Sequence, residues 1–351
     1  MIFPANLDTL VTKKVRSWLE APISSCISEW LATPVKKGGM RIPSLKSNFE
    51  CMRLGKRAAL KHSVNENMRE LWLETGRNSI NSTPDSLLHD RSFPVAKKAL
   101  TRSQEAAAQE HLLNLGYQGL SSKIVVDNIP MTHIIDWNNC LNMLPGFLYN
   151  FVRKGMQQQL PTLSNLLRWG RVPSNICPLC AKPQTNEHVL SNCSNEIVLK
   201  RYTSRHDKIL NILVQWFKYK IKGNIELFVD LNKVGFKQVS DLFLDRRPDI
   251  AFVKGNVVHV LELTVCHETN LLASKQYKIN KYKNLSNCKT NLIKSHDIKV
   301  STCEVSVLGF MAIDQKILDF LAIGNLDNTL RNSITRSVIQ DSFDLYLHRN
   351  G

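Results

Sequence analysis

Apolar side chains recur at helical spacing in the first 75 residues. The recurring positions are Trp18, Leu19, Ile23, Cys26, Ile27 and Trp30. This periodicity predicts a helix. The pattern breaks at Pro34 and at the Lys36-Lys37-Gly38-Gly39 turn, and Pro43 follows. A second helix is predicted over residues 48–63.

Further helices are predicted downstream of a polar stretch. Residues 76–95 are rich in Ser, Asn, Asp and Pro, which is typical of a surface linker. Residues 96–120 contain good helix formers and predict a helix. Residues 141–171 predict helices broken at Pro145 and Pro161, and residues 311–351 again show helix-like patterning.

The periodicity changes to that of strands near residue 250. Two β-branched runs flank Gly255-Asn256, which predicts a hairpin with a type II′ turn. Counting outward from this turn places Lys254 opposite Val257 and Asp249 opposite Glu262. Opposed residues share one sheet face, with β-carbons about 5 Å apart. Two carboxylates so close repel one another unless a cation lies between them, and a hard divalent cation suits oxygen ligands.

The face that carries these two acids is otherwise apolar or small. Its other members are Ala251, Val253, Val258, Val260 and Thr264. Carboxylates at the end of such a face indicate a site for Mg²⁺ or Mn²⁺, which both accept oxygen ligands. The alternative is an ordinary edge hairpin with two exposed acids.

A basic helix is predicted next, over about residues 268–285. Lys275, Lys278 and Lys281 recur every three residues, so they lie along one side of it. A lysine near a metal-bound water can orient that water and offset charge on a phosphate. The alternative is a basic surface that contacts DNA without catalysis.

Four metal-ligating residues cluster within 17 residues of one another. They are Cys177, Cys180, His188 and Cys193, in the order C-x2-C, H, C. Zinc prefers four such ligands in a tetrahedron, and its binding stabilises segments too short to form a core. The spacing therefore predicts a structural zinc knuckle. The alternative is two reduced structural cysteines beside an unrelated histidine and cysteine.

Net charge and cysteine content limit the classes of partner and the cell compartment that the sequence predicts. The net charge is +16, which favours nucleic acid or an anionic membrane surface. No apolar run reaches the roughly 20 residues of a spanning helix, so no membrane partner is expected. The first residues lack the order of a signal peptide. Nine scattered cysteines argue against a disulfide framework and favour a reducing interior, nuclear or cytosolic.

Several motifs in order resemble the C-terminal half of non-LTR retrotransposon proteins that carry a restriction-like endonuclease and insert into ribosomal RNA genes. The resembling segments are Lys37-Gly-Gly-Met-Arg-Ile-Pro-Ser44, Leu160-Pro-Thr, Arg168-Trp-Gly-Arg171, the knuckle, Arg205-His206-Asp207, Pro248-Asp249, Glu262 and Lys278-Ile-Asn-Lys281-Tyr282. The resemblance covers roughly residues 10–300.

The resemblance implies a PD-(D/E)xK-type nuclease core and assigns roles to its residues. Asp249 and Glu262 would hold Mg²⁺, and a lysine from the helix would complete the site, because Thr264 stands where many such nucleases have their lysine. Lys278 is favoured, then Lys281, then Lys275. Accessory roles fall to Arg205, His206, Lys275 and Tyr282. Nucleic acid would be bound by Arg168, Arg171, Arg246 and Arg247.

The expected fold class is α+β or α/β, with helical segments, a CCHC knuckle and a mixed sheet flanked by helices. The segments are a helical post-thumb-like part (1–75), a basic helical linker (76–172), the knuckle (173–197), the nuclease core (198–310) and a helical tail (311–351). The sequence contains no Asp-Asp dipeptide, the usual metal-binding motif of reverse transcriptases. The chain is therefore expected to be one part of a longer element protein, or a truncated copy.

Three interpretations follow for function. The first is an endonuclease that nicks target DNA in the nucleus to prime reverse transcription, with element RNA and a polymerase domain as partners. The second is an inert fragment that binds nucleic acid through its knuckle and basic helices. The third is a structural zinc linker joined to an inert sheet domain. The target sequence and a dimer on DNA stay open.

Overall fold

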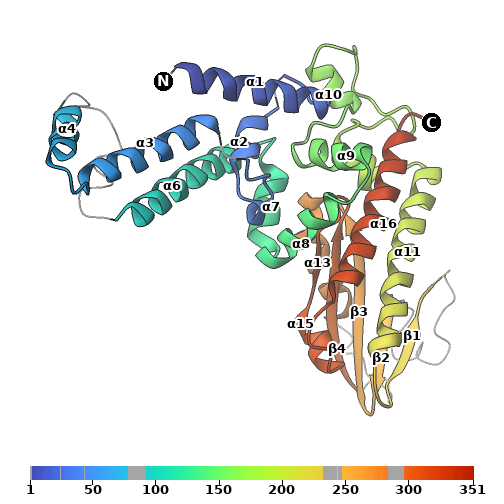
Figure 1. Cartoon of the computed structure of the whole chain (residues 1–351). Coiled ribbons are helices and arrows are strands. Elements are labelled where there is room, and N and C mark those ends of the chain that lie inside the picture. Colours follow the sequence, from blue (N-terminus) through green and yellow to red (C-terminus); the bar gives the residue numbers. More distant parts are fainter. Residues whose placement is uncertain are drawn as a thin grey trace. The chain divides into compact units, whose positions relative to one another are not determined.

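The computed structural model describes residues 2–23, 25–42, 44–77, 92–231, 243, 247–283 and 296–351. The chain divides into two compact units, residues 1–122 and 123–351 (Figure 1). Their boundary falls inside the predicted linker 76–172, most of whose polar stretch lies outside the described residues. No helix in the described ranges is both long and apolar enough to cross a membrane.

The first unit is helical throughout its described part. Its elements are α1 (Ile2–Trp18), α2 (Ile27–Ala32), the short η1 (Val35–Lys37), α3 (Leu45–Lys61), α4 (Glu66–Arg77) and α6 (Phe93–Asn114). The helix predicted over 48–63 is found within a few residues, and the one predicted over 96–120 begins at Phe93 and ends at Asn114. The single helix predicted from the periodicity of residues 18–30 is wrong, because α1 ends at Trp18 and α2 begins at Ile27. Helix α3 begins where Ser44 Oγ accepts from the Ser47 N–H at 2.9 Å, a side-chain cap that satisfies a free backbone donor.

The glycine turn of this unit is fixed by geometry. Gly38 has φ +81°, a left-handed conformation that favours glycine. A β-carbon at Gly39 would lie 2.0 Å from the Thr33 carbonyl oxygen, so only glycine fits there. The carbonyl of Gly38 accepts from Trp30 Nε1 at 3.0 Å. The turn thereby closes onto buried Trp30.

The second unit begins with short helices and continues into the sheet. Its helical elements are α7 (Leu120–Asn128, which contains the unit boundary), α8 (Met131–Leu141), α9 (Gly146–Met156), α10 (Leu163–Arg168), the π-type turn η2 (His188–Asn192), α11 (Glu196–Lys220), η3 (Glu268–Asn270), α13 (Leu271–Lys283), α15 (Gln315–Phe320) and α16 (Asn328–Leu347). The two predicted proline breaks are found: Pro145 is the N-cap of α9, and Pro161 separates α9 from α10.

Five strands of the described residues form one mixed sheet in the order β1-β2-β3-β4-β5. They are β1 (Glu226–Val229), β2 (Ile250–Lys254), β3 (Val257–Cys266), β4 (Asp297–Ser306) and β5 (Met311–Ile313). Strands β3 and β4 are parallel and the other pairs are antiparallel. Parallel neighbours need a crossover connection. Helix α13 lies in that connection.

The predicted hairpin register is confirmed. Lys254 pairs with Val257, and the ladder continues to Ile250 opposite Leu261. The next step outward places Asp249 opposite Glu262. Gly255 has φ +60°, and within this two-residue turn it alone has a positive φ, as a type II′ turn requires.

Helices cover both faces of the sheet. On one face Phe252 and Leu261 join the main core with α11, where Phe217 meets the Phe252 ring edge-on at 5.1 Å. Helix α16 packs beside α11 and buries Ile334 and Val338 in the same core (Figure 1). The C-terminal tail is therefore part of the core of this unit.

The opposite face holds a smaller core beneath α13. Ala251, Val258 and Val260 pack there with Tyr282 of α13 and with Phe243. Strand β3 is buried on both faces and is mostly apolar, as expected for a central strand, with His259, Glu262 and Thr264 as its polar residues. Asp249 and Glu262 lie at the end of this smaller core.

Candidate active site and metal centre

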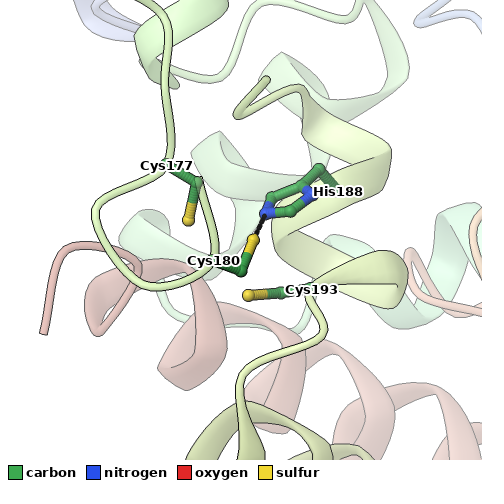
Figure 2. Close-up of side chains that lie close together, drawn as sticks. All are labelled: Cys177, Cys180, His188 and Cys193. Carbon is green, nitrogen blue, oxygen red and sulfur yellow. Dashed lines mark hydrogen bonds between the residues drawn. The ribbon is translucent and has the colours of Figure 1, made fainter. Parts of the chain in front are cut away.

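The four predicted zinc ligands converge on one point. Figure 2 shows the side chains of Cys177, Cys180, His188 and Cys193 pointing toward one another. Their ligand atoms all lie within 4.8 Å of one another, and Cys180 Sγ is 3.3 Å from His188 Nε2. A tetrahedron with bonds of about 2.3 Å has edges of about 3.8 Å. The Cys3His cluster could hold a zinc ion.

Local turns bring these ligands together. The Cys177 N–H donates to the Lys182 carbonyl at 2.7 Å, and the Ala181 N–H donates to the Cys177 carbonyl at 3.0 Å. These bonds close the C-x2-C segment as a tight turn. The π-type turn η2 then carries His188 at its start, and Cys193 follows its end. These four ligands and the turns between them lie within the knuckle, residues 173–197.

The knuckle is supported by the helices that follow it. Tyr202 of α11 accepts from the Cys193 N–H at 3.2 Å and donates to the Val189 carbonyl at 2.9 Å. Leu345 of α16 packs against Cys177 and Cys193. Burial raises the pKa of a thiol, but hydrogen bonds from the backbone of Lys182 and Ser194 outweigh this at Cys180 and lower its pKa. A lower pKa favours the thiolate at Cys180, the form that binds metals, whereas burial raises the pKa of Cys193 to about 11.

The predicted nuclease residues also meet, at the α13 face of the sheet. Lys278 Nζ of α13 lies 3.3 Å from Asp249 Oδ2, and it is also bonded to Glu262 Oε2. Asp249 Oδ2 accepts from the Leu263 N–H at 2.8 Å, which fixes its carboxylate against β3. One ammonium group thus bridges the two opposed carboxylates. We call Asp249, Glu262, Lys278, Lys281 and Tyr282 the carboxylate–lysine cluster.

Glu262 is held from three sides. Lys281 Nζ lies 3.3 Å from Glu262 Oε1, and the Tyr282 hydroxyl donates to the same oxygen. Its side chain is 0% exposed, whereas the Asp249 side chain is 14% exposed. Solvent therefore reaches the cluster at Asp249 and at the two lysines, and not at Glu262.

His206 of α11 extends the cluster. Its Nε2 lies 3.6 Å from Asp249 Oδ1, and its Nδ1 lies 3.1 Å from Asp207 Oδ1. Burial lowers the pKa of this imidazole, but hydrogen bonds and charge from the two aspartates outweigh burial and raise it. Burial alone would raise the pKa of Asp249, but His206 and Lys278 outweigh burial and lower it to about 2.

Burial also opposes the charge on Lys278. The two carboxylates that it contacts outweigh this effect and raise the pKa of its ammonium group. The cluster therefore combines an ionised Asp249 with a protonated Lys278 at neutral pH.

Two predicted accessory residues lie elsewhere. Arg205 is 2% exposed and donates to Ser342 Oγ and to the Leu190 carbonyl, both at 2.9 Å. It joins α11 to α16 and to η2 rather than lying in the carboxylate–lysine cluster, and its accessory role stays a prediction. The helical period explains this, because consecutive residues point about 100° apart and only His206 turns toward Asp249.

Lys275 contacts a different carboxylate. Its Nζ lies 2.7 Å from Asp314 Oδ1, just after β5, and Asp314 Oδ2 accepts from the Thr302 N–H at 3.0 Å. Glu304 is opposite Thr264 in the register, on the same face as Glu262, and burial raises its pKa. Glu304 and Asp314 were not among the site residues predicted from the sequence. An acid between apolar Cys303 and Val305 was the available signal for Glu304.

The predicted nucleic-acid contacts are only partly described. Arg168 and Arg171 are exposed, and the Arg171 guanidinium lies 5.7 Å from the Trp169 ring centroid. Arg247 is exposed and forms an ion pair with Asp230, while its carbonyl accepts from Lys281 Nζ at 3.2 Å. Arg246 lies outside the described residues.

The comparisons with known proteins add no family to this geometry. No protein-family model matches the chain, and no curated protein matches it in sequence.

Proposed function

We propose that the second unit is a metal-dependent endonuclease of the restriction-like, PD-(D/E)xK type, which cleaves a phosphodiester bond of DNA. The observation that carries this proposal is the meeting of Asp249, Glu262 and Lys278. They come from the start of β2, the middle of β3 and the crossover helix α13. Two acids and a lysine at one end of an apolar sheet face serve no packing purpose.

The residues present fit a divalent cation. Carboxylate oxygens of Asp249 and Glu262 both reach Lys278 Nζ, so they already surround a position of positive charge. Oxygen donors of this kind suit Mg²⁺ or Mn²⁺. A cation bound there would supply Lewis-acid stabilisation of charge on a phosphate.

The remaining residues of the cluster position the two carboxylates and neutralise their charge. Lys278 balances the two carboxylates and, with Lys281, presents positive charge where a phosphate would approach. The Tyr282 hydroxyl orients Glu262, and His206 orients Asp249. Preorganised donors of this type stabilise developing charge without reorganisation.

The resemblance to non-LTR retrotransposon proteins supports a wider proposal. In it, the nick would prime reverse transcription by a polymerase domain outside this chain, with target DNA and element RNA as partners and the nucleus as the place of action. The knuckle and exposed Arg168 and Arg171 would contact the nucleic-acid backbone. A net charge of +16 supports a polyanionic partner.

The test is nicking of supercoiled plasmid by the purified chain with Mg²⁺ or Mn²⁺. Wild type should nick, and Asp249→Ala should abolish nicking while DNA affinity in a filter-binding assay stays within about twofold. Asp297→Ala is the matched control, since it removes an exposed acid from β4 of the same sheet. Equal nicking by wild type and Asp249→Ala would overturn the assignment.

A second candidate function is nucleic-acid binding without cleavage. The buried side chain of Glu262 favours it, because a nuclease fragment that has lost its activity would also keep this carboxylate away from solvent. Tight, salt-dependent DNA binding with no nicking in either metal would establish this candidate and exclude the first.

A further inference from the structure

A pocket of about 350 Å³ opens beside the carboxylate–lysine cluster. Its walls come from η2 of the knuckle, the end of β3, and the segment from η3 into α13. The side chains that matter are Asn192, Thr264, Asn270, Ser274, Tyr277 and Lys278. Lys278 belongs to both places, so the pocket and the two carboxylates share a wall.

The two asparagines that line the pocket are held in place by one carboxylate. Glu187 Oε1 accepts from Asn192 Nδ2 at 2.7 Å and from Asn270 Nδ2 at 2.8 Å. Each amide also has an oxygen and a second N–H, so it can offer an acceptor and a donor to a ligand. Fixed amides of this kind can match the polar edge of a nucleobase.

Tyr277 supplies an aromatic surface at the same pocket. Its side chain lies on α13, one residue before Lys278, and the residue is 70% exposed. Bases stack on exposed aromatic rings of nucleic-acid-binding proteins whatever their sequence. The volume lies at the small end of the range for ligand pockets, which suits one base with its sugar.

We infer that this pocket binds one unpaired nucleotide next to the phosphate that is cleaved. The inference rests on the proposed endonuclease function. A base in this pocket would stack on Tyr277 and bond to the asparagines, while its phosphate would lie at Lys278. A pocket of this size does not admit a base pair. The nucleotide must therefore be flipped out of the duplex or already single-stranded.

The experiment measures binding of 12-nucleotide single strands by fluorescence anisotropy, with Ca²⁺ in place of Mg²⁺ so that no cleavage occurs. One position at a time is replaced by an abasic site. Wild type is compared with Tyr277→Ala and Tyr277→Phe. Tyr219→Ala is the matched control, since Tyr219 is 81% exposed at the end of α11 in the same unit.

Tyr277→Ala should lose affinity about tenfold, while Tyr277→Phe, which keeps the ring, should bind like wild type. When the abasic site lies at one or two adjacent positions, wild type should bind the abasic strand less tightly than the intact strand. Tyr277→Ala should bind that abasic strand as tightly as it binds the intact strand. With Mg²⁺, wild type should cut beside that position. Tyr219→Ala should show no positional coupling.

The outcomes separate this inference from the proposed function. Positional coupling without any cleavage would keep the nucleotide pocket and overturn the nuclease. If wild type cleaves DNA but Tyr277→Ala binds single strands as tightly as wild type, the pocket is overturned and the nuclease is kept. The same conclusion follows if Tyr277→Ala loses the same affinity for every strand, wherever the abasic site lies.

Discussion

The knuckle and the carboxylate–lysine cluster are two polar sites in one compact unit, and they differ in how their charge is balanced. In the knuckle, three thiols and an imidazole point at one another, within 4.8 Å. In the carboxylate–lysine cluster, each carboxylate already has an ammonium partner from α13.

This difference predicts different dependence on metal. Thiolates packed together repel unless a cation joins them, so order in the knuckle should require an ion. The carboxylates are balanced by Lys278 and Lys281, so the sheet should fold without a divalent cation. Zinc should therefore act on stability, whereas Mg²⁺ or Mn²⁺ should act on cleavage.

The largest effect should come from removing zinc. Apparent binding free energies of structural zinc sites are about 10–16 kcal/mol, comparable with the whole stability of a domain. Chelation under reducing conditions, or Cys180→Ser, should therefore unfold the knuckle and lower the melting temperature of the second unit by about 10 °C or more. Calorimetry and elemental analysis measure this, with one zinc expected per chain.

Cys51→Ser is the matched control, because Cys51 lies on α3 of the first unit and is not a ligand. Added Zn²⁺ should restore the melting temperature of the chelated wild type, and added Mg²⁺ should not. Protein that contains no zinc after reducing purification, yet melts as before, would remove the distinction between the two sites.

Lys278→Ala should give the next largest effect. It leaves Asp249 and buried Glu262 facing one another, and breaking a buried ion pair costs about 3–5 kcal/mol. Nicking should fall by about 10²-fold, the size of effect found when one charge-stabilising donor is lost. Urea unfolding and plasmid nicking measure the two losses.

Lys281→Ala is the comparison that sharpens this prediction. Tyr282 still donates to the same oxygen of Glu262, so the loss of stability should be about 1 kcal/mol or less. Millimolar Mg²⁺ should restore the stability of Lys278→Ala, because a cation replaces the ammonium, but it should not restore nicking. Equal losses of stability and of nicking in both variants would mean that Lys278 is not the main partner of the two carboxylates.

The two sites also differ in what the sequence could predict. The knuckle ligands lie within 17 residues, and local turns alone bring them together, so their spacing was sufficient. The facing of Asp249 and Glu262 was also predictable, because the Gly255 turn fixes the register of the hairpin.

The lysine contacts and the rest of the sheet depend on tertiary packing, which the sequence pattern does not specify. The contact between Lys278 and both acids depends on how the crossover helix α13 lies over the sheet, which period-three spacing of lysines does not specify. The same spacing placed Lys275 beside Lys278, yet Lys275 binds Asp314 at the end of β5. The parallel pairing of β3 with β4 and the core role of α16 depend on contacts distant in sequence.

The smallest effect should be a pH dependence that belongs to the carboxylate–lysine cluster. The pKa of His206 is raised above its ordinary value of 6.5, since Asp249 and Asp207 outweigh burial and the opposing charge of Lys278. A raised pKa stabilises the fold fully below about 6.5, and this contribution is lost as pH rises through the folded value. Wild type should thus lose its stability advantage over His206→Gln in urea unfolding as the pH is raised above about 6.5. Exposed His348, replaced by Gln, is the control and should show no such change. An advantage that stays constant across this range would mean that His206 is neutral beside Asp249.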